Sequence, residues 1–188
     1  MQLGYFEDRA TRRARVQDLM VAAADGNVDA QIALAWQYVQ SDFLPLDLAL
    51  AGNWFDRAAA SGEEEAIVHR ARFLQLRRVP QGNRELRRLA ASGNAKAQFW
   101  LAQHYESRGH RVSALKAVVW YDRSSRNGNL IARMAKSVLL MRLAPLSSKP
   151  IFAAAALREM ALAMRRLAPS EQRMDRYEAL QYRLKPRS

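Results

Sequence analysis

Residues 23–62 read AADGNVDAQIALAWQYVQSDFLPLDLALAGNWFDRAAASG, and this stretch decides how the rest of the chain is interpreted. Two apolar segments of helical length are separated by a turn that contains Pro45. Glycine, at 26 and again at 62, readily adopts the left-handed conformation that ends a helix, and Asn27 can cap the helix that follows. The stretch therefore predicts one helical hairpin, with a stop and a start signal at each end.

The same pattern recurs along the chain. The glycine returns at intervals of 36, 31 and 35 residues, a period typical of helical repeat arrays. An alanine stands four positions after each glycine, a small residue nine after it and a bulky residue twelve after it. In chain order the columns are Gly26, Gly62, Gly93 and Gly128; Ala30, Ala66, Ala97 and Ala132; Ala35, Ala71, Ala102 and Ser137; and Tyr38, Leu74, Tyr105 and Leu140.

These columns predict an all-α protein with a single domain over residues 1–188. We expect an N-terminal capping helix within 1–25, four helical-hairpin repeats over 26–168, and a C-terminal capping helix within 169–188. The second and fourth repeats are degenerate. Terminal helices are needed because an array of stacked hairpins otherwise exposes its apolar ends.

The first helix of each repeat also carries an apolar face opposite the small-residue columns. At 100° per residue, the positions six, ten and thirteen after each glycine point away from the alanines. We predict that this face lines a groove that binds a partner, whereas Trp54 and Trp120 of the second helices pack in the core. The alternative, left open, is that the apolar face packs on neighbouring repeats. The candidate partner-binding residues are Ile32, Trp36, Arg72, Phe99, Gln103, Arg133 and Met134.

The charge of the chain favours an acidic partner. Thirty Lys and Arg residues face 18 Asp and Glu residues, a formal net charge of +12, and the excess is concentrated in the last third. An arginine-rich composition can also reflect genomic base composition. No cysteine is present, which excludes disulfides, thiolate zinc sites and cysteine nucleophiles. The charged N-terminal stretch lacks the apolar run of a secretory signal, so a cytoplasmic location is expected.

The sequence offers little enzyme chemistry. Three histidines, at 69, 104 and 110, stand outside any zinc-binding arrangement, and no phosphate-binding or nucleophile motif occurs. Glu63, Glu64 and Glu65 can be interpreted as metal ligands, but acidic residues in a first helical turn are favoured by the helix dipole. We predict no catalytic residue, no metal site, no cofactor and no enzymatic activity.

The repeat pattern resembles the Sel-one-like repeat, a relative of the tetratricopeptide repeat, over about residues 20–143. The first repeat matches best and the third follows it, with Ser113 in place of an aspartate. The resemblance implies a right-handed α/α solenoid that serves as an adaptor or scaffold, commonly in bacterial signalling, envelope and host-interaction settings. It implies no enzyme chemistry. The matching residues of the first repeat are Ala23, Gly26, Ala30, Leu34, Tyr38, Asp47, Ala51, Trp54, Ala58, Ala59 and Gly62.

Two functions remain open from the sequence. The first is a protein-interaction scaffold that binds a peptide or helix of an acidic partner, in signalling or in envelope and polysaccharide-related regulation. The second is binding of nucleic acid or another polyanion through the arginine-rich C-terminal third. The basic residues there do not alternate with aromatics as a base-stacking surface requires, which favours the first. The oligomeric state is not predicted.

Overall fold

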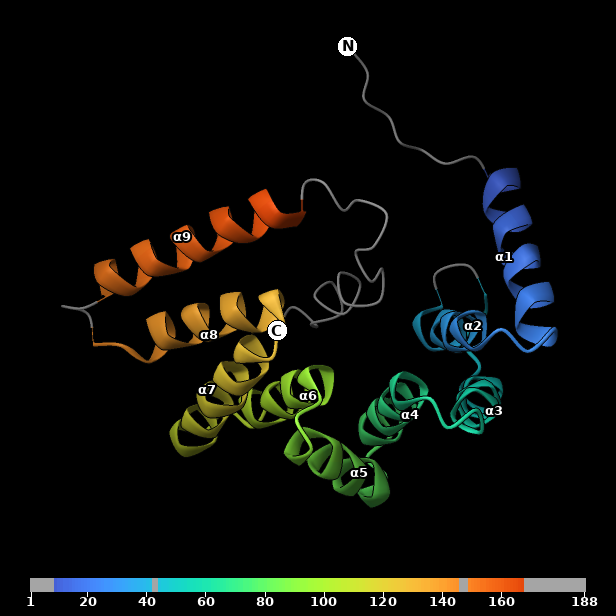
Figure 1. Cartoon of the computed structure of the whole chain (residues 1–188), viewed down its shortest axis with the longest axis horizontal. Coiled ribbons are helices and arrows are strands. Elements are labelled where there is room, and N and C mark those ends of the chain that lie inside the picture. Colours follow the sequence, from blue (N-terminus) through green and yellow to red (C-terminus); the bar gives the residue numbers. More distant parts are fainter. Residues whose placement is uncertain (1–8, 42–43, 146–148, 168–188) are drawn as a thin grey trace, which may run out of the picture. The chain divides into compact units, whose positions relative to one another are not determined.

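The computed structural model describes residues 9–41, 44–145 and 149–167, and the helices in these ranges follow one another with short connections (Figure 1). The described residues contain helices and turns without strands, as the repeat pattern predicts. The predicted C-terminal capping helix at 169–188 lies outside these ranges. The helices are α1 Arg9–Ala24, α2 Val28–Gln40, α3 Leu48–Ala59, α4 Glu64–Leu76, α5 Pro80–Ala91, α6 Ala95–Glu106, α7 Arg111–Arg126, α8 Leu130–Leu143 and α9 Lys149–Leu167.

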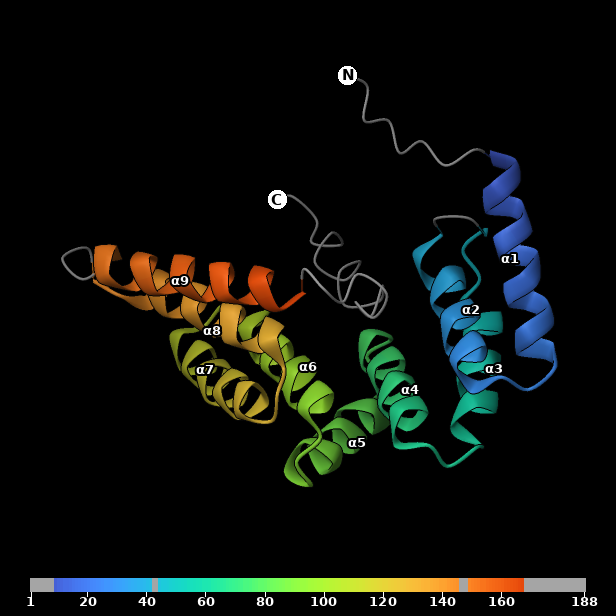
Figure 2. The same cartoon turned by 45° about the horizontal axis from the view of Figure 1, so that its top comes forward.

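The chain forms two compact units, Met1–Arg77 and Arg78–Ser188, which we call the N-terminal and C-terminal units. The boundary falls in the turn between α4 and α5. Within each unit, every helix packs against the next one along the chain (Figures 1 and 2). In the N-terminal unit α2 additionally contacts α4, so the first helices of successive repeats are neighbours.

The helix junctions have the predicted stop and start signals. At the junction of α5 and α6, Gly93 has φ +103°, and the amide of Asn94 donates to the carbonyl of Leu89 at 3.0 Å, an arrangement that closes the end of α5. The side chain of Asn94 then accepts from the amide of Ala97 at 2.7 Å and caps α6. The junctions at Asn27 and Asn129 have the same two bonds, whereas Glu63 caps α4 without a side-chain hydrogen bond.

The small-residue columns lie in the core. The alanines four positions after each glycine are buried, as are the small residues nine positions after it. Their size lets adjacent helices approach closely, and aromatic rings fill the remaining space. In the N-terminal unit Phe55 contacts Trp36 edge to face at 5.1 Å between ring centroids and Phe73 at 4.9 Å. In the C-terminal unit Phe99 lies 5.7 Å from Tyr121.

Candidate functional site

The apolar face that the sequence assigns to a groove is largely part of the core. Ile32, Trp36 and Phe99 are buried, so the expectation that they are exposed to a partner is wrong. The physical reason is that neighbouring helices enclose the first helices of the hairpins: α2 packs against α1, α3 and α4, and α6 packs against α5 and α7. The three residues pack on neighbouring helices, which is the alternative that the sequence left open.

A hydrogen-bonded chain of three side chains explains the position of Trp36. Its indole Nε1–H donates to Nδ1 of His69 at 2.9 Å, and Nε2 of His69 lies 3.0 Å from Oε1 of Glu65. Since indole nitrogen is a donor only, Nδ1 must accept and Nε2 holds the ring proton, which points to the carboxylate. His69 is therefore a buried packing residue that links α2 to α4.

The other candidate residues are partly accessible and lie on different helices. Arg72 of α4 is half-buried and donates from Nη1 to Oε1 of Gln75 at 2.5 Å. Gln103 of α6 and Met134 of α8 are also half-buried. Arg133 of α8 lies in a polar cleft. Its partner-binding role stays a prediction.

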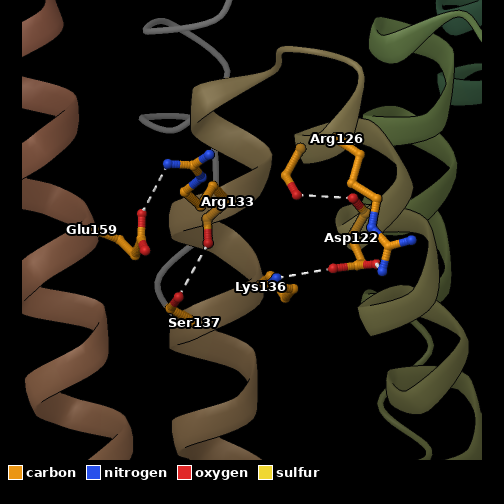
Figure 3. Close-up of a pocket in the computed structure, with 7 residues that line it drawn as sticks. Asp122, Arg126, Arg133, Lys136, Ser137 and Glu159 are labelled. Carbon is orange, nitrogen blue, oxygen red and sulfur yellow. Dashed lines mark hydrogen bonds and ion pairs between the residues drawn. The ribbon is translucent and has the colours of Figure 1, made fainter.

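This polar cleft lies between α7, α8 and α9 and has a volume of about 390 Å³ (Figure 3). Its walls carry three cationic side chains and two carboxylates, so cations are in excess. It belongs entirely to the C-terminal unit. The lining residues are Asp122, Ser125 and Arg126 of α7, Arg133, Lys136 and Ser137 of α8, and Glu159 of α9.

Two sets of ion pairs divide the charges of the cleft. Asp122 is the centre of the first set: its carboxylate accepts from Nζ of Lys136 at 3.0 Å and from Nη2 of Arg126 at 2.7 Å. The hydrogen bond from Lys136 holds the pKa of Asp122 below its ordinary value of 3.8, against the opposing effect of burial. The second set is a single pair, Nη1 of Arg133 and Oε2 of Glu159 at 3.4 Å.

Of the two sets, the ion pair of Arg133 and Glu159 is the one in which another carboxylate can more easily replace the native one. Its 3.4 Å separation is long for a charge-assisted hydrogen bond, and the guanidinium carries five donors. A carboxylate from another molecule can therefore bind Arg133 in the cleft, in addition to Glu159 or in its place. Of the charged residues of the cleft, the sequence singled out Arg133 alone. The i, i+4 spacing of Asp122 and Arg126 was a signal for the first set.

The tryptophans of the second helices have a different environment from the predicted one. Trp54 and Trp120 are half-buried rather than fully in the core. One side of Trp54 packs on the cluster around Ala30 and Leu34, and the guanidinium of Arg57 lies 4.7 Å from its ring centroid. Arg123 stacks on Trp120 in the same way at 4.8 Å. The repeat thus places an equivalent Trp–Arg stack on the outer side of α3 and α7.

Sequence reasoning missed a pair of buried glutamines. Gln31 and Gln98 stand five positions after the glycines of the first and third repeats, and each donates its side-chain amide to a carbonyl of the preceding helix, Ala23 at 3.1 Å and Ala90 at 2.9 Å. Their equal position in the two best repeats was the available signal. In the fourth repeat Arg133 occupies this position, which brings a charge to the cleft.

The described residues include no group of three or more metal-ligating side chains. Among the helices of these ranges, none combines the length and the apolar character that a membrane crossing needs.

The fold defines the chain as a helical-hairpin repeat protein of the α/α solenoid class. More particularly, it has the Sel-one-like repeat fold. The protective antigen c5321 of uropathogenic Escherichia coli strains, which displays an SLR fold, is similar with a TM-score of 0.53 and 22% identity, over 79% of this chain and 33% of that chain. A Sel1 repeat protein from Oxalobacter formigenes is similar with a TM-score of 0.55 and 23% identity, over 78% of this chain and 62% of that chain.

This chain therefore spans a third of the first structure and less than two thirds of the second. No family model matches the chain, and no curated protein matches it.

Proposed function

We propose that this protein is a non-catalytic scaffold that binds an acidic peptide or helix of a partner protein. The observation that carries the proposal is the polar cleft of α7, α8 and α9, where Arg133 forms a long ion pair beside a cavity of about 390 Å³. Cations exceed carboxylates in this cleft, and the chain as a whole has a net charge of +12. Both properties favour an acidic ligand.

The fold supports the same proposal. In this chain the apolar residues Ile32, Trp36 and Phe99 of the first helices are buried, so recognition falls to exposed residues of the first and second helices. Aromatic and arginine side chains dominate the energetics of protein interfaces, and α3 and α7 each present a partly exposed tryptophan beside an exposed arginine. Arg72, Gln103 and Met134, which are half-buried, are the other members of the predicted partner site that retain exposed surface.

The test is a binding measurement with a labelled acidic peptide pool, in which each peptide carries several Glu and Asp residues. Arg133→Gln is the informative variant, because glutamine occupies the equivalent position in the first and third repeats and is compatible with the fold. We expect it to weaken binding about tenfold, since a charge-assisted contact is lost. Arg87→Gln, on the exposed side of α5, is the matched control and leaves affinity unchanged.

A mixed-sequence oligonucleotide of similar length serves as the competing ligand. Tighter binding of the oligonucleotide, unaffected by Arg133→Gln and abolished by charge reversal of Arg173 and Arg176, contradicts the proposal. These two arginines lie outside the described residues. That result assigns the basic C-terminal third to polyanion binding instead.

A further inference from the structure

Helix α7 carries an apolar stripe on the side that faces away from its neighbours. Val112, Leu115 and Val119 are 67%, 52% and 51% exposed, although each is a large hydrophobic side chain. At 100° per residue they lie within one 60° sector of the helix, opposite the buried Ala117 and Tyr121. We call these three residues the α7 outer stripe. Apolar side chains gathered in this way on a soluble surface mark an interaction site.

The repeat architecture does not require this stripe. The residues that align with the α7 outer stripe in the first repeat are Leu46, Ala49 and Asn53, and in the second repeat Arg77, Pro80 and Arg84. In the first repeat Leu46, just before α3, and Leu50 of α3 are exposed, whereas α5 has no exposed large hydrophobic residue among its described positions. On α9, Ile151 and Leu157 are exposed but lie about 120° apart around the helix. Among the described residues, three exposed large hydrophobic side chains within one sector of a helix occur on α7 alone.

Basic side chains border the stripe on both sides. Arg111 lies on one side of it, and Lys116 and Arg123 lie on the other; all three are exposed. The ring of Trp120 holds Arg123 at 4.8 Å, which orients its guanidinium before any ligand arrives. The one acidic residue of α7, Asp122, is paired with Arg126 and Lys136. The stripe thus combines apolar contact area with positive charge.

We propose that the α7 outer stripe docks an amphipathic helix whose apolar face is bordered by acidic side chains, contributed by a partner protein. This inference rests on the proposed scaffold function and assigns it a second surface and a ligand geometry. From Val112 to Val119 the stripe extends about 10 Å, two turns of helix, which matches apolar residues at i, i+3 and i+7 of a second helix. Acidic flanks on that helix face Arg111, Lys116 and Arg123.

The charges disfavour a second copy of this chain as the occupant. A twofold dimer through the stripe places the same surface opposite itself, so Lys116 and Arg123 of one copy meet the same basic residues of the other. Like charges in such an interface oppose association. An acidic helix removes this conflict.

The experiment uses three synthetic 14-residue peptides and the full chain. The first peptide has leucines at helical spacing bordered by glutamates, the second has lysines in place of the glutamates, and the third has the residues of the first in an order without an apolar face. Binding is measured by fluorescence anisotropy. We expect only the first peptide to bind, with an affinity that falls several-fold between about 50 and 300 mM salt.

Leu115→Ser with Val119→Ser is the informative double variant, and we expect it to weaken binding of the first peptide tenfold or more. Val138→Ser with Leu157→Ser is its matched control, because it makes the same two changes at positions that are 46% and 62% exposed on α8 and α9. The control keeps the affinity of the unmodified chain. Circular dichroism verifies that both variants are folded.

Four outcomes overturn the inference, and they separate it from the proposed function. If the first peptide binds the stripe variant as tightly as the unmodified chain, and Arg133→Gln loses this binding, the scaffold function is kept but the site is the polar cleft. Failure of the first peptide and of the acidic peptide pool refutes both proposals. A dimer that the stripe variant converts to a monomer, seen by sedimentation, makes a second copy the occupant. If the chain binds phosphatidylglycerol vesicles through the stripe and does not bind the peptide, the α7 outer stripe is a lipid-binding surface.

Discussion

The indole nitrogen of Trp36 needs a hydrogen-bond acceptor wherever the ring is buried, and His69 provides it. The pair lies between α2 and α4, with Phe55 against the edge of the indole. A buried donor without a partner costs about 1 to 3 kcal/mol, and the bond to His69 removes this cost when the large ring is buried. The bond to His69 thus satisfies the donor of the tryptophan that is buried in the first repeat.

We predict that Trp36→Ala lowers the free energy of unfolding by about 3 to 5 kcal/mol, because it empties a site where the native side chain is 2% exposed. Trp54→Ala costs clearly less, since that side chain is partly exposed and packs on one side against Arg57. Urea denaturation of the two variants measures both values. An equal or larger loss for Trp54→Ala contradicts the burial of the two rings.

The lowered pKa of Asp122 predicts a pH dependence. A carboxyl group whose folded pKa lies below its unfolded pKa stabilises the fold above the unfolded value, and the contribution disappears as the pH falls through the folded value. We therefore expect Asp122→Asn to cost about 0.5 to 1 kcal/mol near pH 7. The difference from the unmodified chain shrinks as the pH falls below 3.8 and vanishes once the carboxyl of the folded chain is protonated.

Unfolding midpoints measured from pH 7 to pH 3 check this dependence. Asp56→Asn, in an exposed ion pair with Arg70, is the comparison variant and costs less at pH 7. A difference for Asp122→Asn that stays constant with pH means that Lys136 does not stabilise the charged form.

At the scale of the element, residues that are close in the sequence determine where a helix begins and ends. They do not determine which of its faces is buried. The glycine and asparagine signals predict where helices end and begin, because the bonds that they form lie within six residues of sequence. The buried face of a first helix depends on how many neighbours enclose it, which the helical period of one segment does not contain. The available signal was the run from Ala30 to Trp36, seven residues without a charge, since a helix that is apolar all round is buried on all sides.

Two glycine substitutions with opposite expected outcomes compare a helix junction with a helix interior. Gly93→Val places a β-branched residue at φ +103°, and we predict a loss of about 1 to 2 kcal/mol. Gly52→Ala, inside α3, places a methyl group 3.5 Å from Cε1 of Phe73, an ordinary contact. Alanine favours the helix over glycine there, so we predict a gain of about 0.5 to 1 kcal/mol. Thermal unfolding measures both, and equal signs for the two changes contradict the assignment.

At the scale of the molecule, the boundary between the compact units falls inside the second repeat, in the turn after Arg77. The single domain over residues 1–188 stays a prediction. Repeat arrays transmit stability between adjacent hairpins, which favours one cooperative transition. The polar cleft and the α7 outer stripe both belong to the C-terminal unit. The partner-binding residues predicted from the sequence lie in both units.

The tryptophans provide reporters for this question, because Trp36 and Trp54 lie in the N-terminal unit and Trp100 and Trp120 in the C-terminal unit. We predict that a double variant without Trp36 and Trp54 and a double variant without Trp100 and Trp120, each with phenylalanine in their place and tryptophans in one unit only, give fluorescence transitions that coincide with each other and with circular dichroism during urea unfolding. Two separate transitions contradict the single domain and establish two domains that meet at residues 77 and 78.

The glycine and asparagine junctions also have a kinetic consequence. Each joint forms from residues that are close in the chain, and most helix pairs join segments that follow one another directly, so little loop entropy is lost before a hairpin gains its contacts. Chains with such short sequence separations between contacting residues fold fast. Because similar joints occur along the array, a hairpin can nucleate at any of them and its neighbours can add to it in either direction.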